Sequence, residues 1–211
     1  KRFLKDADLL DDNGFTRFAE IISDIGLDEN LSWALMLANL AYNPQIGWYI
    51  CNISFGETMS KEYVCSMLVD SGADEKWVND VWSSLARILD LPFSHVGLGE
   101  MVKEKNKAVA LYRTGWQVPD ERVILYSLYQ FSEKCGNFKQ FTLTRLLDTS
   151  IESDGISPTQ IFGLNRDTME KILNGLTFNY PDLIEARFTL GLDNITLKSD
   201  KSAEEILNEL F

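Results

Sequence analysis

The chain has only three cysteines and one histidine among its 211 residues, and these residues form no cluster. Cys51, Cys65 and Cys135 lie far apart, with no Cys-x-x-Cys pair and no histidine beside them. This spacing excludes the usual zinc motifs and a disulfide framework. Sparse thiols within apolar patterns are typical of a reducing compartment, where cysteine acts as a small buried hydrophobe. We therefore predict a cytoplasmic protein without a metal or disulfide.

Long apolar runs are also missing. No run approaches the roughly 18 residues needed to cross a bilayer, and no basic segment precedes an apolar leader. The sequence thus predicts no membrane partner. Because the first residue is Lys1 and the segment 4–13 resembles an acidic lead-in, we expect a region cut from a longer chain.

Positive charge is scarce relative to negative charge. Lys and Arg number 20 against 32 Asp and Glu, so the net charge is −12, divided evenly between the segments on either side of Gln117. Neither half has the excess of Lys and Arg that is typical of a nucleic-acid-binding module. The length allows one large core or two small ones.

Helical periodicity and turn signals predict a helix-turn-helix followed by a hairpin in the first half. We expect helices over 16–25, from Asp28 to an end at Pro44, over 60–71 and over 74–89, and a short aromatic stretch over 45–53. The second of these is apolar nearly all round, which predicts a central core helix. Strands over 101–102 and 108–112 flank the polar turn 103–107, so the hairpin resembles the wing of a winged helix.

The second half repeats this order without obvious sequence identity. The pattern predicts helices over 121–134, 142–147 and 167–176, a turn at Ser157-Pro158, strands over 183–190 and 194–197, and a last helix over 202–210. The second hairpin is a second candidate wing, with its turn at Gly191-Leu192-Asp193.

We predict a mainly α fold with short β-hairpins, arranged as tandem winged-helix-like units. The segments are an acidic lead-in with the first helix (1–29), unit 1 (30–116), unit 2 (119–198) and a C-terminal helix (199–211). The boundary at 115–120 contains no flexible linker, so we expect the units to pack together. A single all-helical domain with two surface hairpins is the alternative.

No constellation in the sequence predicts catalysis. The only histidine, His95, has no nucleophile motif around it. Gly97-Leu98-Gly99 follows no strand and opens no helix, unlike a phosphate loop. The acidic residues between Asp6 and Asp12 lack the closing glutamate of a calcium loop. We expect no catalytic residue, cofactor or metal in this segment.

One local charge pattern opposes the overall sign. Lys103, Lys105, Lys107 and Arg113 give the segment 101–115 a local charge of +3, which makes them candidate contacts for phosphate or a partner. Both helices in the recognition position, however, carry several acidic residues, which predicts weak binding to a duplex. Three tryptophans, Trp33, Trp77 and Trp82, fit core positions, whereas Trp48 and Tyr49 are candidate exposed contacts.

The second half resembles a known family region. The resemblance is carried by Leu125–Tyr129, Phe141–Leu143, Asp154–Gly163, Asn174–Leu176, Asn179–Pro181 and Leu192–Ile195, and extends weakly to Leu91–Phe93 and Gly97–Gly99. Together these are similar to the C-terminal region of large bacterial proteins of the phosphoadenosine phosphosulfate (PAPS) reductase family. The resemblance covers about three quarters of the chain, and its motifs do not indicate a particular reaction.

The resemblance implies that the parent protein handles an adenylylated or sulfur-bearing substrate through an upstream domain. That domain's Ser-Gly-Gly-x-Asp-Ser phosphate loop is not present here, so no catalytic residue is carried over. The implied function is a non-catalytic accessory domain that docks on the upstream catalytic domain or a protein partner. Related genes also occur in DNA sulfur-modification neighbourhoods, which implies the alternative of a winged-helix module that targets the enzyme to DNA or RNA.

Overall fold

The computed structural model describes residues 2–150, 153–189 and 192–211, which form a mixed α/β fold rich in helix with two antiparallel three-stranded sheets. In chain order the elements are α1 (Arg2–Asp6), α2 (Arg17–Ile25), α3 (Asn30–Leu40), α4 (Pro44–Asn52), β1 (Thr58–Ser60), α5 (Lys61–Asp70), α6 (Glu75–Leu89), η1 (Pro92–Val96), β2 (Glu100–Glu104), β3 (Lys107–Tyr112), α7 (Glu121–Lys134), β4 (Gln140–Thr142), α8 (Leu143–Leu147), α9 (Pro158–Phe162), α10 (Arg166–Asn179), β5 (Ile184–Thr189), β6 (Leu192–Leu197) and α11 (Ala203–Leu210).

The first sheet has the order β1-β3-β2 and joins a short strand to the predicted hairpin. Leu111, which is fully buried, pairs with Met59 on one side and Met101 on the other. Lys105 and Asn106 both have positive φ angles, 47° and 64°, which is the requirement of a two-residue type I′ hairpin turn. Helices α5 and α6 precede the hairpin, and side chains of Ser60 and Asp74 cap their first turns.

The second sheet repeats this arrangement with the order β4-β6-β5. Its central residue Ile195 is fully buried and pairs with Phe141 and Ala186. In both sheets the first short strand ends on the residue that caps the next helix, Ser60 for α5 and Thr142 for α8. The two halves of the chain therefore have the same local architecture, and α9 is an addition in the second half.

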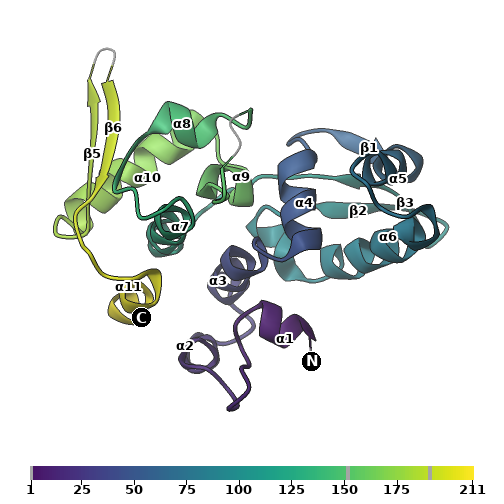
Figure 1. Cartoon of the computed structure of the whole chain (residues 1–211), viewed down its shortest axis with the longest axis horizontal. Helices are drawn as coiled ribbons and strands as arrows, with labels where there is room; N and C mark the ends of the chain where they lie inside the picture. Colours follow the sequence, from purple (N-terminus) through teal and green to yellow (C-terminus); the bar gives the residue numbers. More distant parts are fainter. Residues whose placement is uncertain (1, 151–152, 190–191) are drawn as a thin grey trace.

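Helix α3 lies between the two halves, as its apolar surface predicts (Figure 1). Its Ala34, Leu35, Leu37 and Ala38 are completely buried. It packs against η1 on one side and against α7 and α9 on the other. The prediction of a central core helix is confirmed.

The two halves also meet directly at a close backbone junction. The amide of Trp116 donates a hydrogen bond of 2.7 Å to the carbonyl of Phe162, and Gly97 and Gly115 lie so close to residues 162 and 163 that a Cβ would overlap them. The expectation that the halves pack together is confirmed.

The predicted end of a helix at Pro44 is wrong. Helix α3 ends at Leu40, and Pro44 begins α4, so the aromatic stretch 45–53 is mostly helical. Proline suits the first helical turn because its fixed φ fits and its missing N–H has no partner there. The side chain of Asn43 caps this turn by accepting from the amides of Gln45 and Ile46.

The structure confirms strands at both predicted hairpins and adds β1 and β4. Strands β2, β3 and β6 extend beyond the predicted bounds, so the predicted turn residues Leu192 and Asp193 belong to β6, whereas β5 begins one residue later than predicted, at Ile184. Part of the acidic lead-in is helix α1. The predicted strand end at Leu190 and turn residue Gly191 lie outside the described residues. Within the described ranges, no helix combines the length and the apolar character that crossing a bilayer requires.

Candidate interaction surfaces

The β2–β3 hairpin carries the predicted basic residues, but it presents fewer positive charges than the sequence suggested. Lys103, Lys105 and Lys107 are exposed, and Lys103 donates to Asp90 at 2.7 Å, next to the end of α6. Lys105 and Lys107 form no ion pair with any other residue that the structure describes. Two lysines at the tip are therefore the remaining cations for a phosphate contact.

The expectation that Arg113 belongs to this basic surface is wrong, because its side chain is buried with 1% exposure. One terminal nitrogen of its guanidinium donates to the carbonyls of Ile50 and Ile53 at 2.5 and 2.7 Å, and the other donates to the carbonyl of Gln160. The two contacts on residues 50 and 53 satisfy carbonyls at the C-terminal end of α4, where a cation is electrostatically favoured. Arg113 thus joins α4 to α9.

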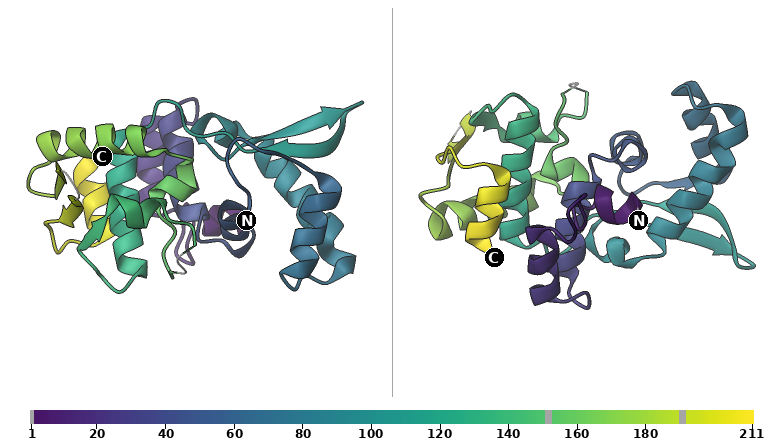
Figure 2. Two further views of the ribbon diagram at one scale, coloured as in Figure 1. Left: turned by 90° about the horizontal axis from the view of Figure 1, so that it is seen from above. Right: turned by 60° about the horizontal axis from the view of Figure 1, so that its bottom comes forward.

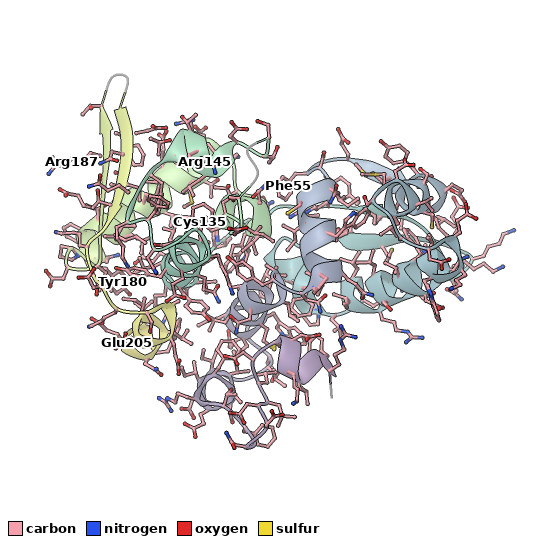
Figure 3. The ribbon with its side chains drawn as sticks, in the orientation of Figure 1. Phe55, Cys135, Arg145, Tyr180, Arg187 and Glu205 are labelled. Atoms are coloured by element: carbon pink, nitrogen blue, oxygen red, sulfur yellow. The ribbon has the colours of Figure 1, made fainter. Side chains whose placement is uncertain are left out.

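Aromatic rings enclose this guanidinium. The central carbon of the Arg113 guanidinium lies 4.1 Å from the ring centre of Phe55 and 5.6 Å from that of Tyr49. Figure 3 shows Phe55 at the junction between the two halves of the molecule. Burial lowers the pKa of Arg113 to about 10, against an opposing effect from Tyr49 and Cys51, so the group is still cationic at neutral pH.

Tyr49 was expected to be an exposed contact and is instead buried with 1% exposure. Its hydroxyl donates to the carbonyl of Leu98 at 2.8 Å, and burial raises its pKa. Trp48 is half-buried, and its indole N–H donates to the Ser71 hydroxyl at 2.9 Å. Tyr49 therefore holds α4 against the segment after η1. Adjacent residues of a helix point in different directions, so Tyr49 faces inward while Trp48 is only half-buried.

The sequence interpretation also missed two exposed aromatic side chains. Trp77 on α6, which was assigned to the core, is 56% exposed, and Tyr63 on α5 is exposed to the same extent. Trp82, one turn and a half further along α6, is buried as expected. Trp77 lies in the first turn of α6, and periodicity alone does not reveal which turns of a helix are covered by other elements.

Helices α5 and α6 project from the rest of the molecule. Figure 2 shows these blue helices extending away from the central helices in both views. Between Asp74 and Asp90 the chain carries four acidic and two basic residues, and Lys76 pairs with Asp74 at 2.8 Å. The solvent-exposed surface of α5 and α6 therefore carries both aromatic and acidic side chains.

The second half has a comparable hairpin, β5–β6, which side-chain contacts connect to α8 and α10. The carboxylate of Asp193 on β6 accepts hydrogen bonds from the Thr144 amide and hydroxyl at 2.8 and 2.7 Å, and lies 3.5 Å from the guanidinium of Arg166. Burial raises the pKa of Asp193, but the hydrogen bonds from Thr144 and Arg166 together outweigh it, so the pKa lies below its usual value. Arg166, in the first turn of α10, is committed to this contact and to Glu170.

Within the described part of the chain, no group of three or more His, Cys, Asp or Glu side chains is placed to hold a metal ion. His95 is exposed on η1. In the lead-in, Asp11 accepts from the amides of Asn13 and Gly14, so its carboxylate shapes a turn.

Comparison of the chain with known protein families, with characterised proteins and with solved structures gives no match.

Proposed function

We propose that this chain is a non-catalytic docking module built from two winged-helix-like units, and that it serves as the C-terminal accessory region of a PAPS reductase-like protein. When η1 and α9 are set aside, the order helix, strand, helix, helix, strand, strand occurs twice, as α4-β1-α5-α6-β2-β3 and as α7-β4-α8-α10-β5-β6. Each sheet places its last strand in the middle. This repeated topology supports the two units, and the sequence resemblance supports the parent protein.

The observation that carries the docking function is the exposed face of α5 and α6. In a winged-helix unit bound to DNA, the helix at the position of α6 enters the major groove. Here that helix and its flanks have an excess of acidic residues, which phosphate repels. Exposed Trp77 and Tyr63 are instead the residue types that contribute most to protein interfaces. We place the contact with the upstream catalytic domain on this face.

Hydrogen exchange measured on the full-length protein and on this chain alone tests the proposal. Peptides from α5 and α6 are expected to exchange at least about tenfold more slowly in the full-length protein, because docking excludes water from their exposed face. The double substitution Tyr63→Ser and Trp77→Ser should remove this difference, whereas Phe138→Ser, at a 69% exposed position in the second half, should retain it. Equal exchange of α5 and α6 in the two proteins would reject docking on the upstream domain.

Nucleic-acid binding is the second candidate function, and the two unpaired lysines at the hairpin tip are the observation that favours it. The double substitution Lys105→Ala and Lys107→Ala is compared with Lys103→Ala, whose ion pair with Asp90 already neutralises it. We expect only weak binding to a labelled duplex at low salt, lost at physiological salt, because two phosphate contacts supply little affinity. Arg113 stays unchanged in this test because it is buried. Tight binding at physiological salt that depends on Lys105 and Lys107 would favour the nucleic-acid module.

A further inference from the structure

A groove formed by α1, the loop after it and α2 lies outside the docking face and is lined mostly by apolar side chains. It has a volume of about 630 Å³, within the range of ligand-binding clefts. Its apolar lining includes Leu4, Leu9, Phe15, Ala19, Ile22 and Leu27. Phe15 is 80% exposed and Leu27 is 59% exposed. Figure 1 shows α1 and α2 below the centre of the molecule, well away from α5 and α6.

The periodicity of α2 produces this groove. Phe18 and Ile21 point inward and are buried, while Ala19 and Ser23 follow Phe15 at intervals of four residues along a second face, which lines the groove. Besides its buried face, α2 thus presents Ala19 and Ser23 to the groove, next to Phe15, which precedes the helix. Contacts with α3 and the lead-in leave the second face open to solvent.

Hydrogen bonds fix the groove walls in place. The hydroxyl of Thr16 accepts from the amide of Ala19 at 3.1 Å and caps α2. Leu10 and Phe15 form an antiparallel bridge that closes the lead-in loop. The indole N–H of Trp33 donates to the carbonyl of Leu27 at 2.8 Å. Phe15 and Leu27, the two exposed large apolar side chains of the groove, thus lie on backbone that is already ordered, which lowers the entropic cost of binding a partner.

The charge around the groove is strongly negative. Between Arg2 and Glu29 the chain has three basic and eight acidic residues, a net charge of −5. The basic residues are all engaged, Arg2 with Asp6, Lys5 with Asp12 and Arg17 with Glu20. Burial raises the pKa of nearby Asp8, and the charges of Glu204 and Asp11 raise it further. The field at the groove therefore favours a cationic partner.

We propose that this groove binds an amphipathic, basic helical segment of a partner protein. Its apolar residues, spaced three and four apart, would insert between Phe15 and Leu27, and its lysines and arginines would face the acidic rim. A helix fits because the groove is lined by side chains and not by an unpaired strand edge, so the ligand must satisfy its own backbone groups. A second copy of this chain fits less well, since its net charge of −12 opposes self-association.

The probe is a fluorescein-labelled peptide of about 18 residues, or five helical turns, with leucines at helical spacing and lysines elsewhere. Its affinity for the chain is measured by fluorescence anisotropy at physiological salt. A scrambled peptide of the same composition and charge is the control for non-specific attraction to an acidic protein. We expect the amphipathic peptide to bind at least about tenfold more tightly than the scrambled one, a difference of about 1.4 kcal/mol.

Two variants separate the apolar and the charged contributions. Phe15→Ser with Leu27→Ser should weaken binding at least about tenfold, because both side chains belong to the contact. Asp24→Asn with Asp28→Asn should weaken it by about threefold and reduce its salt dependence. Val118→Ser is the matched control, since Val118 is also exposed (84%) and lies outside the groove. All substituted positions are exposed, so an unchanged circular dichroism spectrum and melting temperature are expected.

Three results would overturn this proposal. The first is equal affinity for the amphipathic and scrambled peptides. The second is an equal loss of affinity in Val118→Ser and in Phe15→Ser with Leu27→Ser. The third is a dimer of the unmodified chain in sedimentation that Phe15→Ser with Leu27→Ser abolishes, which would assign the groove to a second copy.

Discussion

Arg113 shows that an arginine next to a basic hairpin can serve the interior of the protein instead of its surface. It forms no ion pair with a carboxylate in the described part of the chain, and its terminal nitrogens donate to three backbone carbonyls instead. In sequence it follows the basic hairpin directly, so its local charge pattern is the same as that of Lys103 or Lys107. Whether Arg113 is buried depends on α4 and α9, which are distant from it in sequence, so no local sequence pattern predicts its burial.

Removing this guanidinium should be costly. Arg113→Met keeps the apolar stem and leaves three carbonyls without their donor, so we expect a loss of about 2–4 kcal/mol in the free energy of unfolding by urea. Lys103→Met is the control, because both side chains of the Lys103–Asp90 pair are about half exposed and such pairs contribute at most about 1 kcal/mol. Similar losses in the two variants would show that Arg113 has no special structural role.

Asp193 is a second residue whose role depends on its neighbours. Its pKa lies below the usual value of 3.8 because Thr144 and Arg166 stabilise the carboxylate. An acid with a lowered pKa stabilises the fold fully above its usual pKa, and this stabilisation is lost as the pH falls through the folded-state pKa.

Asp193→Asn should therefore be less stable than the unmodified chain at pH 7, by about 1 kcal/mol. The difference should shrink as the pH is lowered through and below 3.8, where the carboxylate of the unmodified chain becomes protonated. Urea unfolding at a series of pH values measures it. A difference that stays constant down to acid pH would mean that the charge of Asp193 has no part in holding the β5–β6 hairpin to α8.

At the scale of elements, helices were predictable where both ends carried a chemical signal. The capped helix α7 was predicted with the bounds that the structure shows, 121–134. The helices predicted to start at residues 60, 74, 142 and 202 begin on the residues whose side chains cap α5, α6, α8 and α11. Strands β1 and β4 were missed because they have three residues each and end on a cap, so the signal of the following helix obscures them. Pro44 was misassigned because proline follows helix ends and also begins helices.

The candidate surfaces were less predictable than the elements. Charge pattern located the basic hairpin, but not the ion pair that neutralises Lys103 or the burial of Arg113. Periodicity assigned Trp77 to the core, yet it is exposed because no other part of the described chain covers it. Whether an apolar face is covered depends on how distant elements pack, and this information is spread over the whole sequence.

At the scale of the whole molecule, the junction between the halves depends on glycines that allow two backbones to touch. A Cβ on Gly97 would lie 2.4 Å from the carbonyl oxygen of Phe162 and 2.7 Å from the nitrogen of Trp116. A Cβ on Gly115 would lie 2.3 Å from the carbonyl oxygen of Gly163. Because the obstructing atoms belong to the backbone, a larger residue would have to move one half of the molecule relative to the other.

Gly97→Ala tests whether this close contact stabilises the molecule, and Gly72→Ala is its matched control. Both glycines have a φ of 93°, so alanine is strained to a similar degree at each, but a Cβ on Gly72 has no atom within 4 Å. We expect Gly72→Ala to cost about 1 kcal/mol in the free energy of unfolding, the usual cost of a side chain at positive φ. Gly97→Ala should cost about 2–3 kcal/mol more, because the backbone overlap adds to the same strain. Hydrogen exchange should also become faster at the amide of Trp116, which bonds to Phe162 across the junction. Equal costs for the two variants, with unchanged exchange at Trp116, would mean that the halves adjust to the added atom freely and that their arrangement is not fixed by this contact.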